Sequence, residues 1–149
     1  MIGDLIDSVL GRAGIMTPPT QKIKDDWHLL FTIFGPEVKI LQYCHSHGAT
    51  HVKNALLTSS EEVRQRIIVL AIAPAEIIPR KLCFQSYNYM SRRDFVTHFD
   101  IVGKMRHRDE LTILDPHPDA SFFDHDFLSP TFAPVIQYHI NKYFENYGV

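Results

Sequence analysis

The spacing of apolar residues alternates along the chain between helix-like and strand-like stretches. Residues 4–13 and 21–34 repeat apolar positions every three to four residues, which predicts two amphipathic helices. Residues 38–43 are a short apolar run, and residues 67–73 are continuously apolar and rich in β-branched side chains. A strand that is apolar on both faces is typical of a buried parallel sheet. We therefore expect two parallel strands, connected through a helix over residues 49–57.

Two capping signals mark the starts of predicted helices. Thr20 stands directly before the helix over residues 21–34, where its hydroxyl can accept a backbone hydrogen bond. Ser59 is followed three residues later by Glu62, which is the spacing of a capping box. The second signal predicts a short helix over residues 61–66, directly before the second strand.

Three more elements are predicted in the second half of the chain. Residues 81–89 form a third and less apolar strand, residues 111–114 form a fourth, and residues 133–147 form a closing helix with one apolar stripe. Alternating strands and helices indicate the α/β class, with about four parallel strands and flanking helices. We expect one domain, in which residues 1–36 are the N-terminal helices and residues 37–149 are the core.

The same spacing predicts which side chains the helices bury. An amphipathic helix turns its apolar stripe toward the sheet on which it packs. The side chains expected to face the core are Trp27, Phe31 and Phe34 in the helix before the first strand, Val52, Ala55 and Leu56 in the helix after it, and Ile136, Ile140, Tyr143 and Phe144 in the closing helix.

Composition and charge narrow the class of protein. A chain of 149 residues that is 45% hydrophobic can form a domain with a real core. Its net charge is −2 and its fifteen basic residues form no long block, so we expect no nucleic-acid partner. Neither a signal peptide nor the roughly 20 apolar residues of a membrane span is visible. Cys44 and Cys83 form no CxxC pair. We therefore expect reduced thiols in a cytoplasmic protein.

The turn between the first strand and its helix carries the most specific chemical signal. The segment Cys44-His45-Ser46-His47-Gly48 places a serine at the apex of a sharp turn, with small residues on both sides. Small residues are expected there because the turn brings two backbones together. The segment resembles the nucleophile elbow of the α/β-hydrolase (lipase and esterase) superfamily, with Cys44 where glycine is usual. This resemblance implies a hydrolase-like parallel sheet.

A nucleophilic serine needs a base to take its proton and a carboxylate to orient that base. In the α/β-hydrolase order, the acid follows the serine and the histidine comes last. Asp94 follows the third strand in a turn that resembles the acid-bearing turn of lipase-like hydrolases, and Asp115, after the fourth strand, is the alternative acid. His125 lies in the last long loop. We predict the triad Ser46, Asp94 and His125, with the backbone N–H of His47 as an oxyanion donor.

Each of these residues also has a purely structural interpretation. A serine in a strand-to-helix turn such as Ser46 can be a helix cap, and a loop histidine such as His125 is usually solvated. His45, His47 and His51 cluster around the turn, and two or three imidazoles could hold zinc. Their spacing matches no zinc motif, so we expect no metal and no cofactor.

The turn and the segments that follow it also resemble a chlamydial family of uncharacterised proteins, known as a domain of unknown function. The likeness implies a lipase-like hydrolase fold and puts Ser46, Asp94 and His125 on the matching positions, and it implies no particular substrate. It is carried by residues 44–49, 52–56, 66–75, 89–96, 117–119 and 124–127, which together lie within about residues 38–130.

The chain departs from the superfamily before the elbow. Only 43 residues precede Cys44, and they predict two helices and one strand. A full hydrolase has several strands there, together with the loop that supplies the second oxyanion donor. The sequence is therefore expected to be a short form without those strands. Its strand over residues 38–43 would lie at an edge of the sheet, which the N-terminal helices, a second copy or a missing N-terminal partner could cover.

Two functions are compatible with this pattern. The first is a serine hydrolase that cleaves a small-molecule ester or thioester, which is an acyl substrate. The second is a catalytically silent hydrolase-like module that serves in binding or assembly. A second backbone donor near Ser46, from the helix over residues 21–34 or from Gly35, would favour the enzyme.

Overall fold

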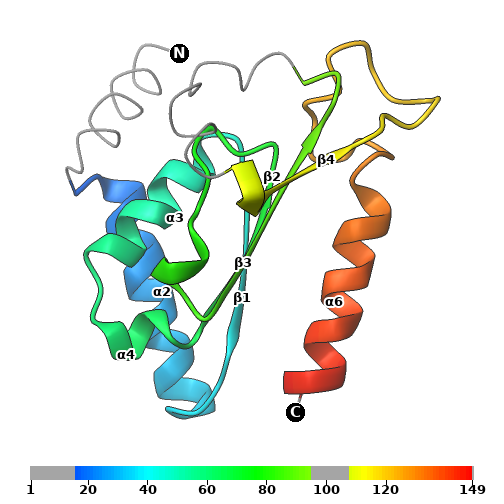
Figure 1. Ribbon diagram of the computed structural model, residues 1–149. Coiled ribbons are helices and arrows are strands. Elements are labelled where there is room, and N and C mark those ends of the chain that lie inside the picture. The colour runs from blue at the N-terminus through cyan, green and yellow to red at the C-terminus, as the bar shows by residue number, and fades with distance from the viewer. Residues whose placement is uncertain (1–15, 95–107, 149) are drawn as a thin grey trace.

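The computed structural model describes residues 16–94 and 108–148, and it is built around one parallel sheet (Figure 1). The predicted helix over residues 4–13 lies outside the described residues. The strands pair in the order β1-β2-β3-β4, which confirms an α/β fold with four parallel strands. Their bounds are Ile40–His45 for β1, Ile67–Ile72 for β2, Gln85–Ser91 for β3 and Leu111–Leu114 for β4.

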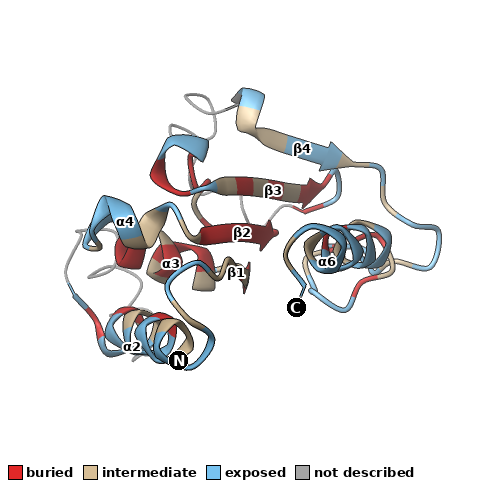
Figure 2. Ribbon diagram, turned by 90° about the horizontal axis from the view of Figure 1, so that it is seen from below, coloured by how far each residue is buried: buried red, intermediate tan, exposed pale blue. Residues whose placement is uncertain are grey.

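Helices cover both faces of the sheet. The helices α2, α3 and α4 lie on one face and α6 lies on the other, as Figures 1 and 2 show. In the part of the chain that the structure describes, no helix combines the length and apolarity needed to cross a membrane. The helices are α2 (Pro18–Phe34), α3 (Gly48–Leu57), α4 (Glu61–Arg64) and α6 (Ala133–Tyr147), and two short 3₁₀ turns are η1 (Arg80–Leu82) and η3 (Arg108–Glu110).

The predicted position of the first strand is two residues too early. The strand β1 begins at Ile40 because pairing with β2 begins there: the N–H of Ile40 donates to the Arg66 carbonyl at 2.8 Å. The register then runs from Ile40 opposite Ile67 to His45 opposite Ile72. Among the described strands, β1 has a neighbour on one side only, so it lies at an edge of the sheet as expected.

The start of α2 differs from the prediction by one turn. Thr17, and not Thr20, is the N-cap, and its hydroxyl accepts a hydrogen bond from the Thr20 N–H at 3.5 Å. Pro18 then occupies the first helical position, where its fixed φ suits the helix and its missing N–H costs nothing. The predicted cap was wrong because Pro18-Pro19 begins the helix instead of interrupting the chain before it.

The capping-box prediction for α4 is also wrong by one residue. The N-cap is Ser60, whose hydroxyl accepts from the Val63 N–H at 3.4 Å. The Ser59 hydroxyl instead donates to the Ala55 carbonyl in the last turn of α3, at 2.7 Å. Ser59 therefore ends one helix and Ser60 begins the next, and α4 stops at Arg64.

The third strand begins later than predicted. Residues 80–82 form the turn η1, and β3 starts at Gln85, directly after the Phe84 N–H donates to the Ile67 carbonyl at 3.0 Å. The strand extends to Ser91, after which the Arg92 N–H donates to the Leu114 carbonyl of β4 at 2.9 Å. The fourth strand and the closing helix have the predicted bounds.

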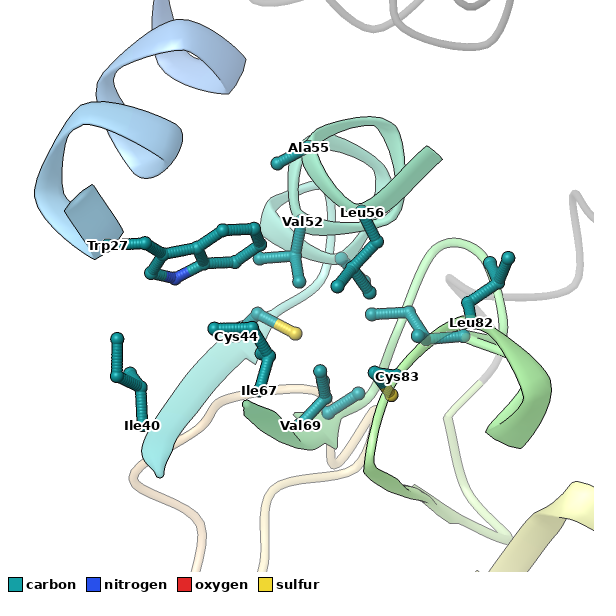
Figure 3. Close-up of a cluster of buried hydrophobic side chains, with 13 residues drawn as sticks. Trp27, Ile40, Cys44, Val52, Ala55, Leu56, Ile67, Val69, Leu82 and Cys83 are labelled. Atoms are coloured by element: carbon teal, nitrogen blue, oxygen red, sulfur yellow. The ribbon is translucent and has the colours of Figure 1, made fainter. Parts of the chain in front are cut away.

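Trp27 is the centre of the core between the sheet and the helices α2 and α3 (Figure 3). Its side chain is 1% exposed, and its indole N–H donates to the Gln42 side-chain oxygen at 2.8 Å. The burial of Val52, Ala55 and Leu56 in α3 is confirmed.

Phe31 packs against the Trp27 core only in part. The prediction for Phe34 is wrong, because this side chain is 61% exposed and lines an open groove beside β1 instead of the core.

The predicted inward stripe of α6 is also only partly buried. Ile136 packs against the second apolar cluster, on the α6 face of the sheet, whereas Ile140 and Phe144 are exposed. His139, a residue that the apolar pattern did not select, is buried instead and bonds to the Tyr89 hydroxyl at 2.8 Å. Burial lowers the pKa of His139, so this imidazole acts as a neutral core residue at neutral pH.

Replacing the central indole should destabilise the fold strongly. For Trp27→Ala we expect the free energy of unfolding to fall by about 3–5 kcal/mol, because a large buried ring is lost and Gln42 loses its donor. Leu29→Ala, on the 56% exposed side of the same helix, is the control and should change the free energy by about 0.5 kcal/mol or less. Urea unfolding followed by circular dichroism measures both, since Trp27 is the only tryptophan. Equal effects of the two changes would contradict this packing.

Candidate active site

Ser46 lies at the apex of a sharp turn between β1 and α3. Its φ is +51°, a left-handed conformation that non-glycine residues rarely adopt and that is found at strained functional turns. The backbone holds it there: the Ser46 N–H donates to the Ile72 carbonyl at 3.3 Å, and the Ser46 carbonyl accepts from the Ala49 and Ala75 N–H groups at 3.1 and 3.0 Å. The turn therefore presents the serine at the carboxyl ends of β1 and β2.

The small residues around the turn are less constrained than the pattern suggests. A Cβ placed on Gly48 would meet the Cβ of Cys44 at 3.8 Å, which is an ordinary van der Waals contact. Cys44 itself is buried in the Trp27 core, and this burial raises the pKa of its thiol far above the usual range. Cysteine at the position where glycine is usual therefore fits the core without strain.

Ser46, His125 and Asp94 form one continuous chain of contacts. The Oγ of Ser46 lies 3.0 Å from Nε2 of His125, and Nδ1 of His125 lies 3.0 Å from both carboxylate oxygens of Asp94. A carboxylate can only accept, so Nδ1 carries the proton, and Nε2 of the neutral ring accepts from the serine hydroxyl. Asp94 is fully buried, and the His125 side chain is 20% exposed.

The structure distinguishes between the two candidate acids. Asp94 follows β3 in a tight turn, in which its N–H donates to the Ser91 carbonyl at 3.0 Å. Asp115 is exposed, and its carboxylate accepts from Nε of Arg92 at 2.9 Å. The contact with His125 is made by Asp94 and not by Asp115.

Asp124 supports this site in a way that the sequence did not predict. It is fully buried with φ +39°, and its carboxylate accepts from the hydroxyls of Ser91 and Ser129, and from that of Thr131 at 2.7 Å. Ser91 ends β3, three residues before Asp94, while Asp124 directly precedes His125. The Asp124 carboxylate therefore ties the histidine loop to the strand that carries the acid.

The electrostatics of Asp124 follow from these contacts. Burial alone would raise the pKa of its carboxyl group, but the hydrogen bonds from Ser129, Ser91 and Thr131, together with the charge of Arg93, outweigh burial and lower it. Ser129 and Thr131 follow Asp124 closely in the chain, but Ser91 lies 33 residues before it, so no local signal in the sequence identifies the complete arrangement.

The histidines of the turn have separate partners. Nε2–H of His45 donates to the backbone carbonyl of His125 at 2.7 Å, and the two rings lie 4.9 Å apart between centroids. His51 instead places Nδ1 3.2 Å from the Thr17 hydroxyl. The bond from His45 makes this residue a second support for the histidine loop, in addition to Asp124.

Within residues 16–94 and 108–148, no group of three or more histidine, cysteine or acidic side chains is arranged to hold a metal ion.

The predicted oxyanion donor is the backbone N–H of His47, and a second donor was expected from α2 or Gly35. The backbone N–H of His47 follows the serine at the first turn of α3, where N–H groups point away from the helix. Neither the helix over residues 21–34 nor Gly35 provides a second donor. The Gln21 N–H donates to the Thr17 carbonyl and the Gly35 N–H donates to the Phe31 carbonyl, both at 3.0 Å. Gly35 also precedes β1 and so lies at the opposite end of that strand from Ser46.

Removing the Asp124 charge should lower stability in a pH-dependent way. Because the pKa of Asp124 is lower in the folded state, its stabilisation is present above the unfolded value of 3.8 and is lost as the pH falls through the folded value. We expect Asp124→Asn to cost about 1–3 kcal/mol of unfolding free energy at neutral pH and to show a smaller loss on acidification.

Urea unfolding over a pH series measures the effect of Asp124→Asn. Asp115→Asn is the matched control, since that carboxylate is exposed, and it should cost about 1 kcal/mol or less. The same cost and the same pH profile in both variants would contradict the role of Asp124.

Comparison of the chain with protein-family models, with curated proteins and with solved structures gave no match. The expected membership of the α/β-hydrolase superfamily and of the chlamydial family therefore stays a prediction. The features that bear on function are the four-stranded parallel sheet, the strained turn at Ser46 and the contacts of His125 with Ser46 and Asp94.

Proposed function

We propose that the protein is a serine hydrolase that cleaves a small-molecule ester or thioester. The observation that carries this proposal is the unbroken path from the Ser46 hydroxyl through both ring nitrogens of His125 to the buried carboxylate of Asp94. A solvated loop histidine or a serine that only caps a helix would not need such an arrangement. Each group has the position that nucleophile, general base and orienting acid require.

In the first half of the reaction, Ser46 Oγ attacks the carbonyl carbon of the substrate while its proton moves to Nε2 of His125. The carbonyl π electrons move to the oxygen, which the His47 N–H stabilises as a donor. When the tetrahedral intermediate collapses, the C=O bond re-forms and the bond to the leaving alcohol or thiol breaks. The leaving group takes the proton from Nε2, and an acyl-serine remains.

In the second half, water takes the place of the alcohol or thiol. His125 accepts a proton from the water, whose oxygen attacks the acyl-serine carbonyl, and collapse releases the acid and returns the proton to Ser46. Asp94 stays ionised throughout and stabilises the imidazolium that forms twice. Asp124 and His45 act through His125, because both hold its loop and neither takes part in the proton transfers.

The alternative function, a catalytically silent module for binding or assembly, is favoured by a different observation. The scheme has a single oxyanion donor, the His47 N–H, and loss of one such donor costs on the order of 10²–10³ in rate. The strand β1 also has an edge without a described neighbour, at which a second copy or another chain could pair. Reactivity of Ser46 decides between the two functions.

The first test is labelling with a fluorophosphonate, which reacts with activated serines. We expect the native protein to be labelled, and Ser46→Ala and His125→Ala to lose labelling, because the first lacks the nucleophile and the second lacks the base that activates it. Circular dichroism of each variant serves as the folding control. A folded native protein that is not labelled, or a Ser46→Ala protein that is, would remove Ser46 from the mechanism and favour the silent module.

The second test separates the two candidate acids. In Asp94→Asn the amide can donate to Nδ1, which leaves the proton on Nε2 and prevents it from accepting from Ser46. We expect kcat for p-nitrophenyl acetate to fall on the order of 10⁴. Asp115→Asn should leave kcat unchanged, because that carboxylate bonds to Arg92 at the surface. The opposite result would assign the acid to Asp115.

A further inference from the structure

An apolar groove runs from the turn at Ser46 along the outer edge of β1, and we call it the edge groove. It has three sections, with volumes of about 470, 550 and 570 Å³. Tyr43 and Phe127 line both the first and the second section, while Leu41 and Ile140 line both the second and the third. Because neighbouring sections share lining residues, they adjoin one another along the strand. Figure 2 shows β1 at the side of the sheet that α2 and α6 flank.

The first section lies beside the segments that carry the proposed catalytic residues. His45 and Gly48, which lie on either side of Ser46 in the chain, are part of its wall. Phe127, two residues after His125, forms the opposite wall, with its ring centroid 5.8 Å from that of His45 and 6.3 Å from that of Tyr43. The first section therefore adjoins the two segments that carry the serine and the histidine.

The chemistry of the walls favours a hydrocarbon ligand. Aliphatic and aromatic side chains such as Leu41, Ile136 and Phe144 form most of the surface. Among the described residues that line the three sections, Lys39 alone carries a full charge. Its ammonium group points elsewhere, since it donates to the Gln65 carbonyl at 3.0 Å and lies 4.2 Å from the Phe84 ring centroid. An uncharged chain would thus find matching walls along the whole groove.

The backbone of β1 disfavours a peptide strand as the occupant. The N–H groups of Ile40 and Ser46 bond to the β2 side, so the intervening odd-numbered residues point their backbone groups outward. The outward carbonyl of Tyr43 already accepts a hydrogen bond from the Gln42 amide at 2.9 Å, and that of Lys39, directly before β1, accepts one from the Tyr143 hydroxyl at 2.7 Å. An added strand would have to share both carbonyls with these side chains, whereas a hydrocarbon chain needs no hydrogen bond.

We propose that the edge groove binds the hydrocarbon chain of a long-chain acyl ester or thioester, with the carbonyl carbon placed at Ser46. This inference rests on the function proposed above, and it assigns the substrate class of that site. Each buried methylene should raise affinity by up to about fourfold, since burial of one methylene favours binding by about 0.8 kcal/mol. Long acyl chains are therefore the preferred substrates.

The binding test uses laurate and the Ser46→Ala protein, so that it needs no catalysis. We expect laurate to bind by isothermal titration calorimetry, and Ile140→Glu in the same background to weaken binding at least about tenfold, because a carboxylate in the wall opposes an apolar chain. Ile33→Glu is the matched control: Ile33 is 60% exposed on α2 and lines none of the three sections, whereas Ile140 is 36% exposed at the junction of two. The control should bind laurate like its parent.

The activity test compares p-nitrophenyl laurate with p-nitrophenyl acetate. We expect the native protein to prefer the laurate ester in kcat/KM, Ile140→Glu to reduce the laurate-to-acetate ratio at least about tenfold, and Ile33→Glu to preserve it. A protein that reacts with fluorophosphonate but neither binds laurate nor prefers the longer ester would overturn the edge groove as a chain site and leave the hydrolase intact.

Two other outcomes separate this inference from its alternatives. If laurate binds but Ser46 does not react with fluorophosphonate, the hydrolase and the substrate role of the groove both fail. If sedimentation shows a native dimer that Ile140→Glu converts to monomers, a second copy fills the groove and the acyl chain is not its ligand. A native monomer that passes the binding and activity tests supports the proposal.

Discussion

The parallel direction of all four strands is the constraint on which the rest of this structure depends. In a parallel sheet the carboxyl ends of all strands lie at the same end of the sheet, so the loops that follow the strands meet there. Ser46 follows β1 and Asp94 follows β3 at this end. The loop after β4 returns to the same place and brings His125 between them. Residues separated by 79 and 31 positions therefore come within hydrogen-bonding distance of one histidine.

Parallel strands bring the loops together, but they do not fix the histidine to within hydrogen-bonding distance. That precision comes from Asp124 and His45, which hold the segment around His125 from two sides. The buried Asp124 carboxylate accepts hydrogen bonds from three hydroxyls. It therefore supports the loop without competing with Asp94 for the imidazole ring of His125. A site on a long loop can be as well ordered as one on a strand when a buried charge of this kind anchors it.

The outer edge of β1 has no neighbouring strand among the described residues. An apolar edge strand is a template for pairing with other chains unless its backbone is covered. Here Gln42 and Tyr143 occupy two outward carbonyls, and the indole of Trp27 in turn holds Gln42 in place. The edge is therefore protected by side chains, and the space beside it stays open as an apolar groove that reaches the neighbours of Ser46, His45 and Gly48.

The sequence by itself determined the α/β class, the four strands and the helix positions, because apolar periodicity is a local property. It also proposed Ser46 and His125, with Asp94 or Asp115 as the acid, since a sharp turn and the order of acid and base leave signals in a linear chain. Only the tertiary structure decided between Asp94 and Asp115, and only it identified the role of Asp124, because both depend on which distant groups meet. It also showed that Phe34 and Phe144 line a groove, since periodicity marks an apolar face but not what lies opposite.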